Sequence, residues 1–153
     1  MNKSDKNLFY DVEQRVFFIN GEIEKDLIGE ICFELTKLIN QDNEKEKTYK
    51  DFTRKPIHIH INSRGGTVYD GWRLVSLIES SKTPIYTYCT GYAFSMGFVI
   101  FIAGHRRYMS QFGMLMYHQI SGGQIGKYLD IVQGTKNYER NQNKIEQFIK
   151  SKT

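Results

Sequence analysis

Two side chains in this sequence could together form an activated oxygen nucleophile: Ser95, within Gly91–Gly97, and His118, further along the chain. A serine hydroxyl is a poor nucleophile until a neighbouring imidazole takes its proton, and the resulting oxyanion then needs backbone N–H donors held in place beforehand. The Gly65–Gly66 pair, inside Asn62–Thr67, suits this second task because glycine lets an amide approach without a Cβ in the way. Together these segments predict the centre of a serine peptidase. Taken singly, the serine could instead be a helix cap, the histidine a core residue and the glycines a plain turn.

The first part of the chain predicts a strand followed by a helix. Val16–Ile19 is short and apolar, and Asn20-Gly21 after it is typical of a turn. A helix is expected to begin at Asp26, because apolar residues recur every three or four positions and form one stripe. These are Leu27, Ile28, Ile31, Leu35, Leu38 and Ile39. The charged stretch from Asn40 to Lys55 shows no such pattern, so we expect a loop there.

The same order then repeats. Ile57, Ile59 and Ile61 alternate with polar residues, which predicts a strand that leads into a glycine turn at Gly65–Gly66. Tyr69–Ser80 has helical periodicity, and Ile85–Cys89 is the next expected strand. Alternating strands and helices favour a mostly parallel sheet, in which reactive groups collect at the carboxyl ends of the strands. Both the glycine pair and Ser95 fall at such ends.

Beyond Ser95 we expect a short helix to Ala103, small strands near Tyr108 and at Leu115–Tyr117, and a long helix from Lys127. The candidate contact positions of the long helix are Tyr128, Ile131, Val132, Thr135, Tyr138, Ile145, Phe148 and Ile149. They have no visible partner within the chain, so this helix is expected to pack on another subunit or to project. Gly134 inside it lowers helix stability by about 1 kcal/mol.

Five segments, taken in order and with their spacing, resemble the ClpP family, the proteolytic subunits of the Clp protease. They are Arg15–Ile23, Ile59–Val68, Ala93–Gly97, Ala103–Gly104 and His118–Gly126. The resemblance implies an α/β chain with the ClpP/crotonase-like fold: repeated β-β-α/β-α units, a mostly parallel sheet and a protruding C-terminal handle helix. The corresponding division is a flexible segment at 1–14, a head domain at 15–126 and the handle helix at 127–153.

The resemblance also implies roles for single residues. Ser95 would be the nucleophile, His118 the general base, on a buried strand among apolar neighbours, and the N–H groups of Gly66 and Met96 the oxyanion donors. Ser121–Gly126 would pair as a strand with an extended peptide substrate. The family further implies an endopeptidase of unfolded polypeptides, a homo-oligomer built from heptameric rings, and a separate AAA+ unfoldase as partner. The chain itself has no Gly-x-x-x-x-Gly-Lys-Ser/Thr loop for ATP.

The sequence departs from the family at several positions. His58 and His60 stand where the family tends to have aromatic residues that help to dock the unfoldase, and Arg64 stands where it usually has proline. The triad aspartate of the family lies beyond the handle helix, and Asp130 matches a different aspartate. We therefore expect the 153-residue chain to be truncated and to hydrolyse small peptides poorly. Two alternatives stay open: a catalytically inactive structural or assembly subunit, and an acyl-CoA enzyme of the related crotonase fold.

Composition narrows the remaining classes. The formal charge is only +4, from 21 basic and 17 acidic residues with interleaved signs, which disfavours a nucleic-acid surface. No apolar run approaches the roughly 18 residues that a membrane span needs. Cys32 and Cys89 are expected to be buried, separate thiols, and His58 with His60 are weak evidence for zinc because no third ligand accompanies them. We expect a cytoplasmic protein with no cofactor and no metal.

Overall fold

The computed structural model describes residues 8–123 and 125–153, and the chain divides into two compact units. The first unit ends at Met116 and the second comprises Tyr117–Thr153. The described elements are β1 (Leu8–Asp11), β2 (Val16–Ile23), α1 (Lys25–Thr48), β3 (Ile57–Gly66), α2 (Val68–Ser80), β4 (Ile85–Cys89), β5 (Tyr92–Phe94), α3 (Met96–Ala103), β6 (Arg106–Met109), β7 (Met114–Met116) and α4 (Tyr128–Lys152).

The first unit is built on a seven-stranded, mostly parallel sheet, as the sequence predicted. Its main path runs β1-β2-β3-β4-β6, where only β1 is antiparallel to its neighbour. Strand β5 branches off at the end of β3, through the pair Ser63 and Ala93, and β7 continues this branch. The order means that the carboxyl end of β3 lies beside the segment that precedes Ser95.

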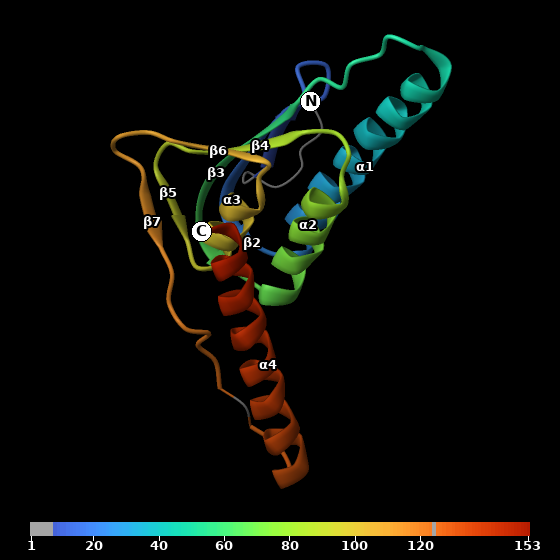
Figure 1. Ribbon diagram of the computed structural model, residues 1–153. Helices are drawn as coiled ribbons and strands as arrows, with labels where there is room; N and C mark the ends of the chain where they lie inside the picture. Colours follow the sequence, from blue (N-terminus) through green and yellow to red (C-terminus); the bar gives the residue numbers. More distant parts are fainter. Residues whose placement is uncertain (1–7, 124) are drawn as a thin grey trace. The chain divides into compact units, whose positions relative to one another are not determined.

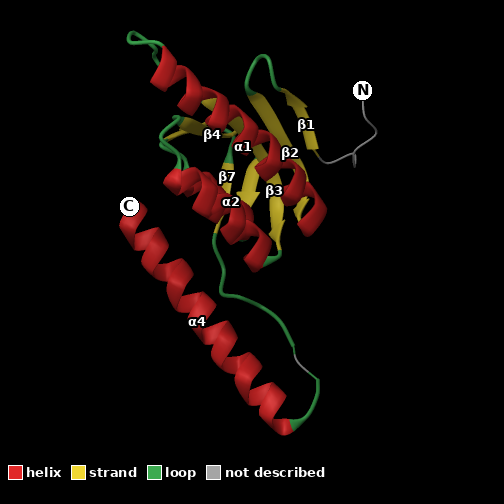
Figure 2. Cartoon of the chain, turned by 90° about the vertical axis from the view of Figure 1, so that its right-hand side faces the viewer, coloured by secondary structure: helices red, strands yellow, loops and turns green. Residues whose placement is uncertain are grey.

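Helices α1 and α2 lie side by side over one face of the sheet (Figures 1 and 2). The alternating isoleucines of β3, which are almost completely buried, point into the core under them. The predicted stripe of α1 is buried from Leu27 to Leu38, whereas Ile39 is only half-buried. Both cysteines are buried and free, as expected. Burial raises the pKa of the Cys32 thiol to about 11, so this thiol is held in its unreactive protonated form.

The stretch from Asn40 to Lys55, predicted as a loop, is helical as far as Thr48. Its polar residues are held by contacts that have no helical periodicity. Asp42, only 1% exposed, receives two hydrogen bonds from Arg15, at 3.0 and 2.6 Å, and one of 2.8 Å from Thr83. Burial alone would raise the pKa of Asp42, but these hydrogen bonds outweigh it and hold that pKa below its usual value.

Two further features at the start of the chain differ from the sequence-based expectation. Asn20-Gly21 is not a turn but an irregularity within β2, whose register against β3 shifts between Asn20 and Glu22. The segment 1–14, expected to be flexible, contributes Leu8–Asp11 as an edge strand that pairs with β2, and its residues 1–7 lie outside the described residues. Strands β1 and β2 extend the sheet on the side of β3 that faces away from β4.

The second unit consists of a connecting segment and α4, which begins at Tyr128, one residue after the predicted start at Lys127. Gln142 of α4 ties this segment to the helix: its amide nitrogen donates to the Tyr117 hydroxyl at 2.5 Å, and its oxygen accepts from the Ile120 amide at 2.9 Å. The residues that bracket His118 are therefore fixed to the same side chain.

Candidate functional site

Ser95 occupies the turn between β5 and α3 and has an unusual backbone conformation, with φ 52° and ψ −121°. A non-glycine residue with positive φ is strained by about 1–2 kcal/mol, so neighbouring contacts must hold it there. Its amide donates to the Met116 carbonyl at 2.8 Å, and its carbonyl accepts from Phe98 at 3.1 Å and Val99 at 3.3 Å. Strained strand-to-helix turns of this kind are how some hydrolases expose a nucleophilic serine.

The amide of Met96 is the first N–H of α3 and has no intrahelical acceptor, as is general for helix starts. It therefore remains available next to the Ser95 hydroxyl. The Met96 side chain, 2% exposed, anchors this end of the helix against Gly71 of α2. There is no room between them, because a Cβ added to Gly71 would overlap the Met96 side chain.

The structure brings the glycine pair to the Ser95 turn. Gly65 has φ 104°, and a Cβ built on it would lie 2.7 Å from the Ser95 Cβ and 3.0 Å from the Met96 nitrogen. Gly66, with φ 151°, packs equally closely on the backbone of Ile23 in β2. In the parallel pairing of β3 with β2, Gly66 lies opposite Ile23, and the Ile23 carbonyl accepts from the Thr67 amide at 2.8 Å. Because bonds to one neighbouring strand come from alternate residues, the Gly66 amide does not bond to β2.

Ser63 supports this arrangement, and the sequence analysis missed it. The Ser63 side chain is completely buried, and its hydroxyl accepts from the Gly65 amide at 3.1 Å. Gly97 of α3 packs against the Ser63 backbone, since a Cβ added to Gly97 would lie 3.1 Å from the Ser63 carbonyl oxygen. A small residue is therefore required between the glycine pair and the start of α3. The available signal was positional, since Ser63 falls on the buried side of the alternation in β3.

His118 does not lie on a buried strand, so this expectation was wrong. Strand β7 ends at Met116, all three of its residues are exposed, and His118 is an exposed residue of the connecting segment. Its Nδ1 atom lies 2.6 Å from the Gln119 carbonyl oxygen. A carbonyl can only accept, so Nδ1 carries the proton, and in the neutral ring Nε2 is left as the acceptor. His118 belongs to the second unit and Ser95 to the first.

The segment Ser121–Gly126 forms no regular strand in its described residues, and Gln124 lies outside them. Gly122 packs on the ring of Tyr138 of α4, where a Cβ would lie 2.6 Å from the hydroxyl. Gly123 has no neighbour that an added Cβ would meet.

The model of the family described as Clp protease matches residues 3–153. The chain belongs to the Clp protease family. It is also 30% identical, over 144 residues, to ATP-dependent Clp protease proteolytic subunit 2 of Bacillus licheniformis, a match that covers 93% of this chain and 70% of the relative. The mixed α/β fold with a mostly parallel sheet and a C-terminal helix agrees with this family.

His58 and His60 form part of a stacked row of rings on the sheet face opposite α1 and α2. His60 stacks on Phe18 and on Tyr88, with ring centroids 4.6 Å apart in both cases, and Tyr88 stacks on Tyr108 at 4.8 Å. The His58 Nδ1 atom is 2.8 Å from the Tyr88 hydroxyl. Burial lowers the pKa of both histidines, which favours neutral rings that pack like the aromatic residues beside them.

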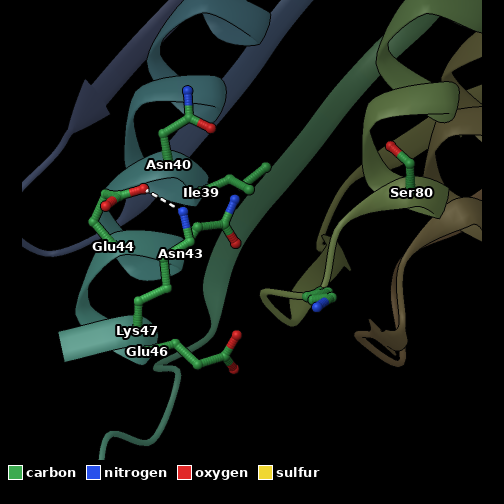
Figure 3. A pocket seen from close by; sticks show the side chains of 8 residues that line it. Ile39, Asn40, Asn43, Glu44, Glu46, Lys47 and Ser80 are labelled. Carbon is green, nitrogen blue, oxygen red and sulfur yellow. Dashed lines mark hydrogen bonds and ion pairs between the residues drawn. The ribbon is translucent and has the colours of Figure 1, made fainter. Parts of the chain in front are cut away.

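A cavity of about 610 Å³ lies between the second half of α1 and the end of α2 (Figure 3). Its charged groups are partly engaged already, since Lys47 donates to Glu44 at 2.9 Å across one helical turn. It contains no nucleophile with a base and lies away from Ser95, so it is not the candidate site. Within residues 8–123 and 125–153, no cluster of three His, Cys, Asp or Glu side chains could hold a metal ion. No helix in this part of the chain is long and apolar enough to cross a membrane.

Proposed function

We propose that this chain is a serine endopeptidase subunit of the Clp type, with Ser95 as nucleophile, His118 as general base, and the amides of Gly66 and Met96 as oxyanion donors. The observation that carries the proposal is the strained Ser95 turn, held against Gly65 and followed by the Met96 amide, the first N–H of α3. Such a turn costs free energy, and a serine whose only task was packing would not need it.

The chemistry follows from the roles of these groups. His118 Nε2 takes the Ser95 proton as Oγ attacks the peptide carbonyl, and the negative charge that develops on the carbonyl oxygen is met by the two amides. The same proton then goes to the leaving amine, which gives an acyl-enzyme. Water, deprotonated by His118, releases the acid and restores the serine. The hydrogen bond from Nδ1 to the Gln119 carbonyl supports this role because it selects the tautomer in which Nε2 accepts.

Chain connectivity supports the pairing of His118 with Ser95. The Met116 carbonyl accepts from the Ser95 amide, and Tyr117 alone separates Met116 from His118. Two Cα–Cα steps of about 3.8 Å each therefore keep the His118 Cα within about 8 Å of the Met116 Cα, whatever direction the chain takes.

We further propose that the substrate is an unfolded polypeptide that pairs along Ser121–Gly126, and that the working form is a homo-oligomer in the cytoplasm. The name of the relative from Bacillus licheniformis describes an ATP-dependent protease subunit. By analogy, ATP would be hydrolysed by a separate AAA+ unfoldase.

Labelling with a fluorophosphonate tests the proposal without a substrate. The probe should modify Ser95, as located by peptide mass spectrometry, and Ser95→Ala should remove the label. His118→Ala should lower the labelling rate by about tenfold or more, which is less than the loss in a complete Ser-His-Asp triad because the effects of triad residues are not additive. Labelling that is indifferent to His118, or that falls on another serine, would exclude the mechanism.

A further inference from the structure

A second cavity, of about 300 Å³, adjoins the glycine pair in the first unit. It is lined by Gly21, Glu22, Arg64, Gly65, Gly66 and Tyr92, which come from β2, β3 and β5. Of the three glycines, Gly65 and Gly66 belong to the candidate oxyanion site. The three side chains of the lining have no part in the chemistry proposed above, so their arrangement needs a separate explanation.

Arg64 is the basic residue in the lining of this cavity. It follows the buried Ser63 in the alternation of β3, and its side chain is therefore exposed. In the described part of the chain, its guanidinium has no hydrogen-bond acceptor and no ion pair. Two other arginines of this unit, Arg15 and Arg54, each bind a carboxylate, at 2.6 and 2.7 Å respectively. Arg64 thus presents five unused donors next to the glycine pair.

The opposite walls are acidic and aromatic. Glu22 lies in β2 beside Gly65, through the register of the two strands, yet forms no ion pair with Arg64 among the described residues. Tyr92 is fixed by its amide, which donates to the Asn62 Oδ1 at 3.3 Å, and its ring packs on Phe94 with centroids 5.2 Å apart. The aromatic wall gives apolar surface on which the stem of a bound side chain can pack.

We propose that Arg64 makes this cavity a subsite for a carboxylate carried by the peptide, close to the bond that is cut. The inference rests on the proposed function, because a peptide reaches this cavity only if it is held over Gly65–Gly66. A guanidinium binds a carboxylate through two parallel hydrogen bonds, which gives geometric selectivity over a neutral amide. Arg64 directly precedes the glycine pair, so the bound group belongs to a residue near the scissile carbonyl. Glu22 opposes the acid and limits its affinity.

The carboxylate can come from a Glu or Asp side chain or from the C-terminus of a peptide. Four fluorescein-labelled hexapeptides separate these sources: Glu or Gln at the central position, each with a free or an amidated C-terminus. Their affinities for the full chain carrying Ser95→Ala are measured by fluorescence anisotropy, so that no hydrolysis is needed. We expect the Glu peptide, or the free acid, to bind about threefold more tightly than its neutral partner, in the range of an exposed ion pair.

Arg64→Gln should abolish this preference, Arg64→Lys should keep part of it, and Glu22→Gln should increase it. Arg73→Gln is the matched control: it removes one exposed arginine charge on α2 and should leave the preference intact, which separates a subsite from a general effect of net charge. Equal affinities for acidic and neutral peptides, or a preference that survives Arg64→Gln, would overturn the inference. Loss of fluorophosphonate labelling with a retained Arg64-dependent preference would instead count against the proposed function alone.

Discussion

Replacing Gly65 by alanine should damage the reactive turn more than its small size suggests. The new Cβ would lie 2.7 Å from the Ser95 Cβ, 2.9 Å from the Phe94 carbonyl oxygen and 3.0 Å from the Met96 nitrogen. Ordinary carbon contacts are about 3.5–4.0 Å, so the turn must open by nearly 1 Å. Overpacking of this kind costs about 1–3 kcal/mol, and the backbone at φ 104° adds about 1–2 kcal/mol for a non-glycine residue. We expect a loss of about 2–5 kcal/mol in the free energy of unfolding.

Urea unfolding measures this loss through the fluorescence of Trp72, the single tryptophan, which is 8% exposed on α2. The fluorophosphonate labelling rate of the folded fraction should also fall, by about a hundredfold for a 1 Å displacement of the reacting groups. Gly29→Ala is the control: its nearest neighbour is Arg73 Nη1 at 3.7 Å, and it lies inside α1, so it should be neutral or stabilising by up to about 1 kcal/mol. If Gly65→Ala unfolds at the same urea concentration as the parent and labels at the same rate, the close approach of β3 to the Ser95 turn is refuted.

Three other changes have defined outcomes. Asp42→Ala leaves the Arg15 guanidinium without its carboxylate and should lower the free energy of unfolding by about 3 kcal/mol at pH 7. Because the pKa of Asp42 is below its usual value, the difference in stability between the parent and this variant should shrink as the pH falls below about 4. Burial lowers the pKa of His60, so as the pH drops below about 6.5 the unfolded chain is protonated at this residue before the folded one, and the free energy of unfolding should fall. In His60→Phe the fall of stability with pH, measured by thermal melting, should be shallower. Gln142→Leu removes two hydrogen bonds that bracket His118 and should slow Ser95 labelling by up to about thirtyfold, at about 1 kcal/mol for each bond.

Matched variants separate these effects from general damage. Lys47→Ala breaks an exposed pair on the same helix as Asp42 and should cost no more than about 0.5 kcal/mol. Gln133→Leu changes an exposed glutamine of α4 whose amide donates to Asn137 of the same helix, and it should leave the labelling rate unaltered. A large effect of either control, or none of its partner variant, would contradict the assigned contacts.

Periodicity predicted the elements whose stability comes from a continuous apolar face. The strand around Ile59 and the helix around Val75 show their buried faces in the sequence, and both were predicted. The predicted turn at Gly65–Gly66 was wrong, because these glycines are the last two residues of β3. The second half of α1 could not be found in this way. Its key residue, Asp42, is stabilised by Arg15 and Thr83, which lie 27 and 41 positions away and leave no local signal.

The candidate site was predictable in part for a related reason. In a parallel sheet, neighbouring strands end at the same edge, so the proximity of the glycine pair to the Ser95 turn follows from topology. The positive φ of Ser95 does not, because it is imposed by contacts from other elements. The placement of His118 failed because an apolar run resembles a buried strand: Met114, Leu115 and Met116 are 59, 38 and 43% exposed.

The Ser95 turn is held from three directions, and in two of them a glycine lets the neighbouring element approach closely. β7 accepts the hydrogen bond of its amide, β3 fits under it through Gly65, and α2 fits against the Met96 side chain through Gly71. None of these contacts is local in sequence, so the conformation of the serine depends on the whole unit being folded. A nucleophile placed this way is reactive only in the native state, because unfolding releases the strain and separates the amides from the hydroxyl. Loss of reactivity should therefore coincide with loss of the sheet, with no reactive partly folded form.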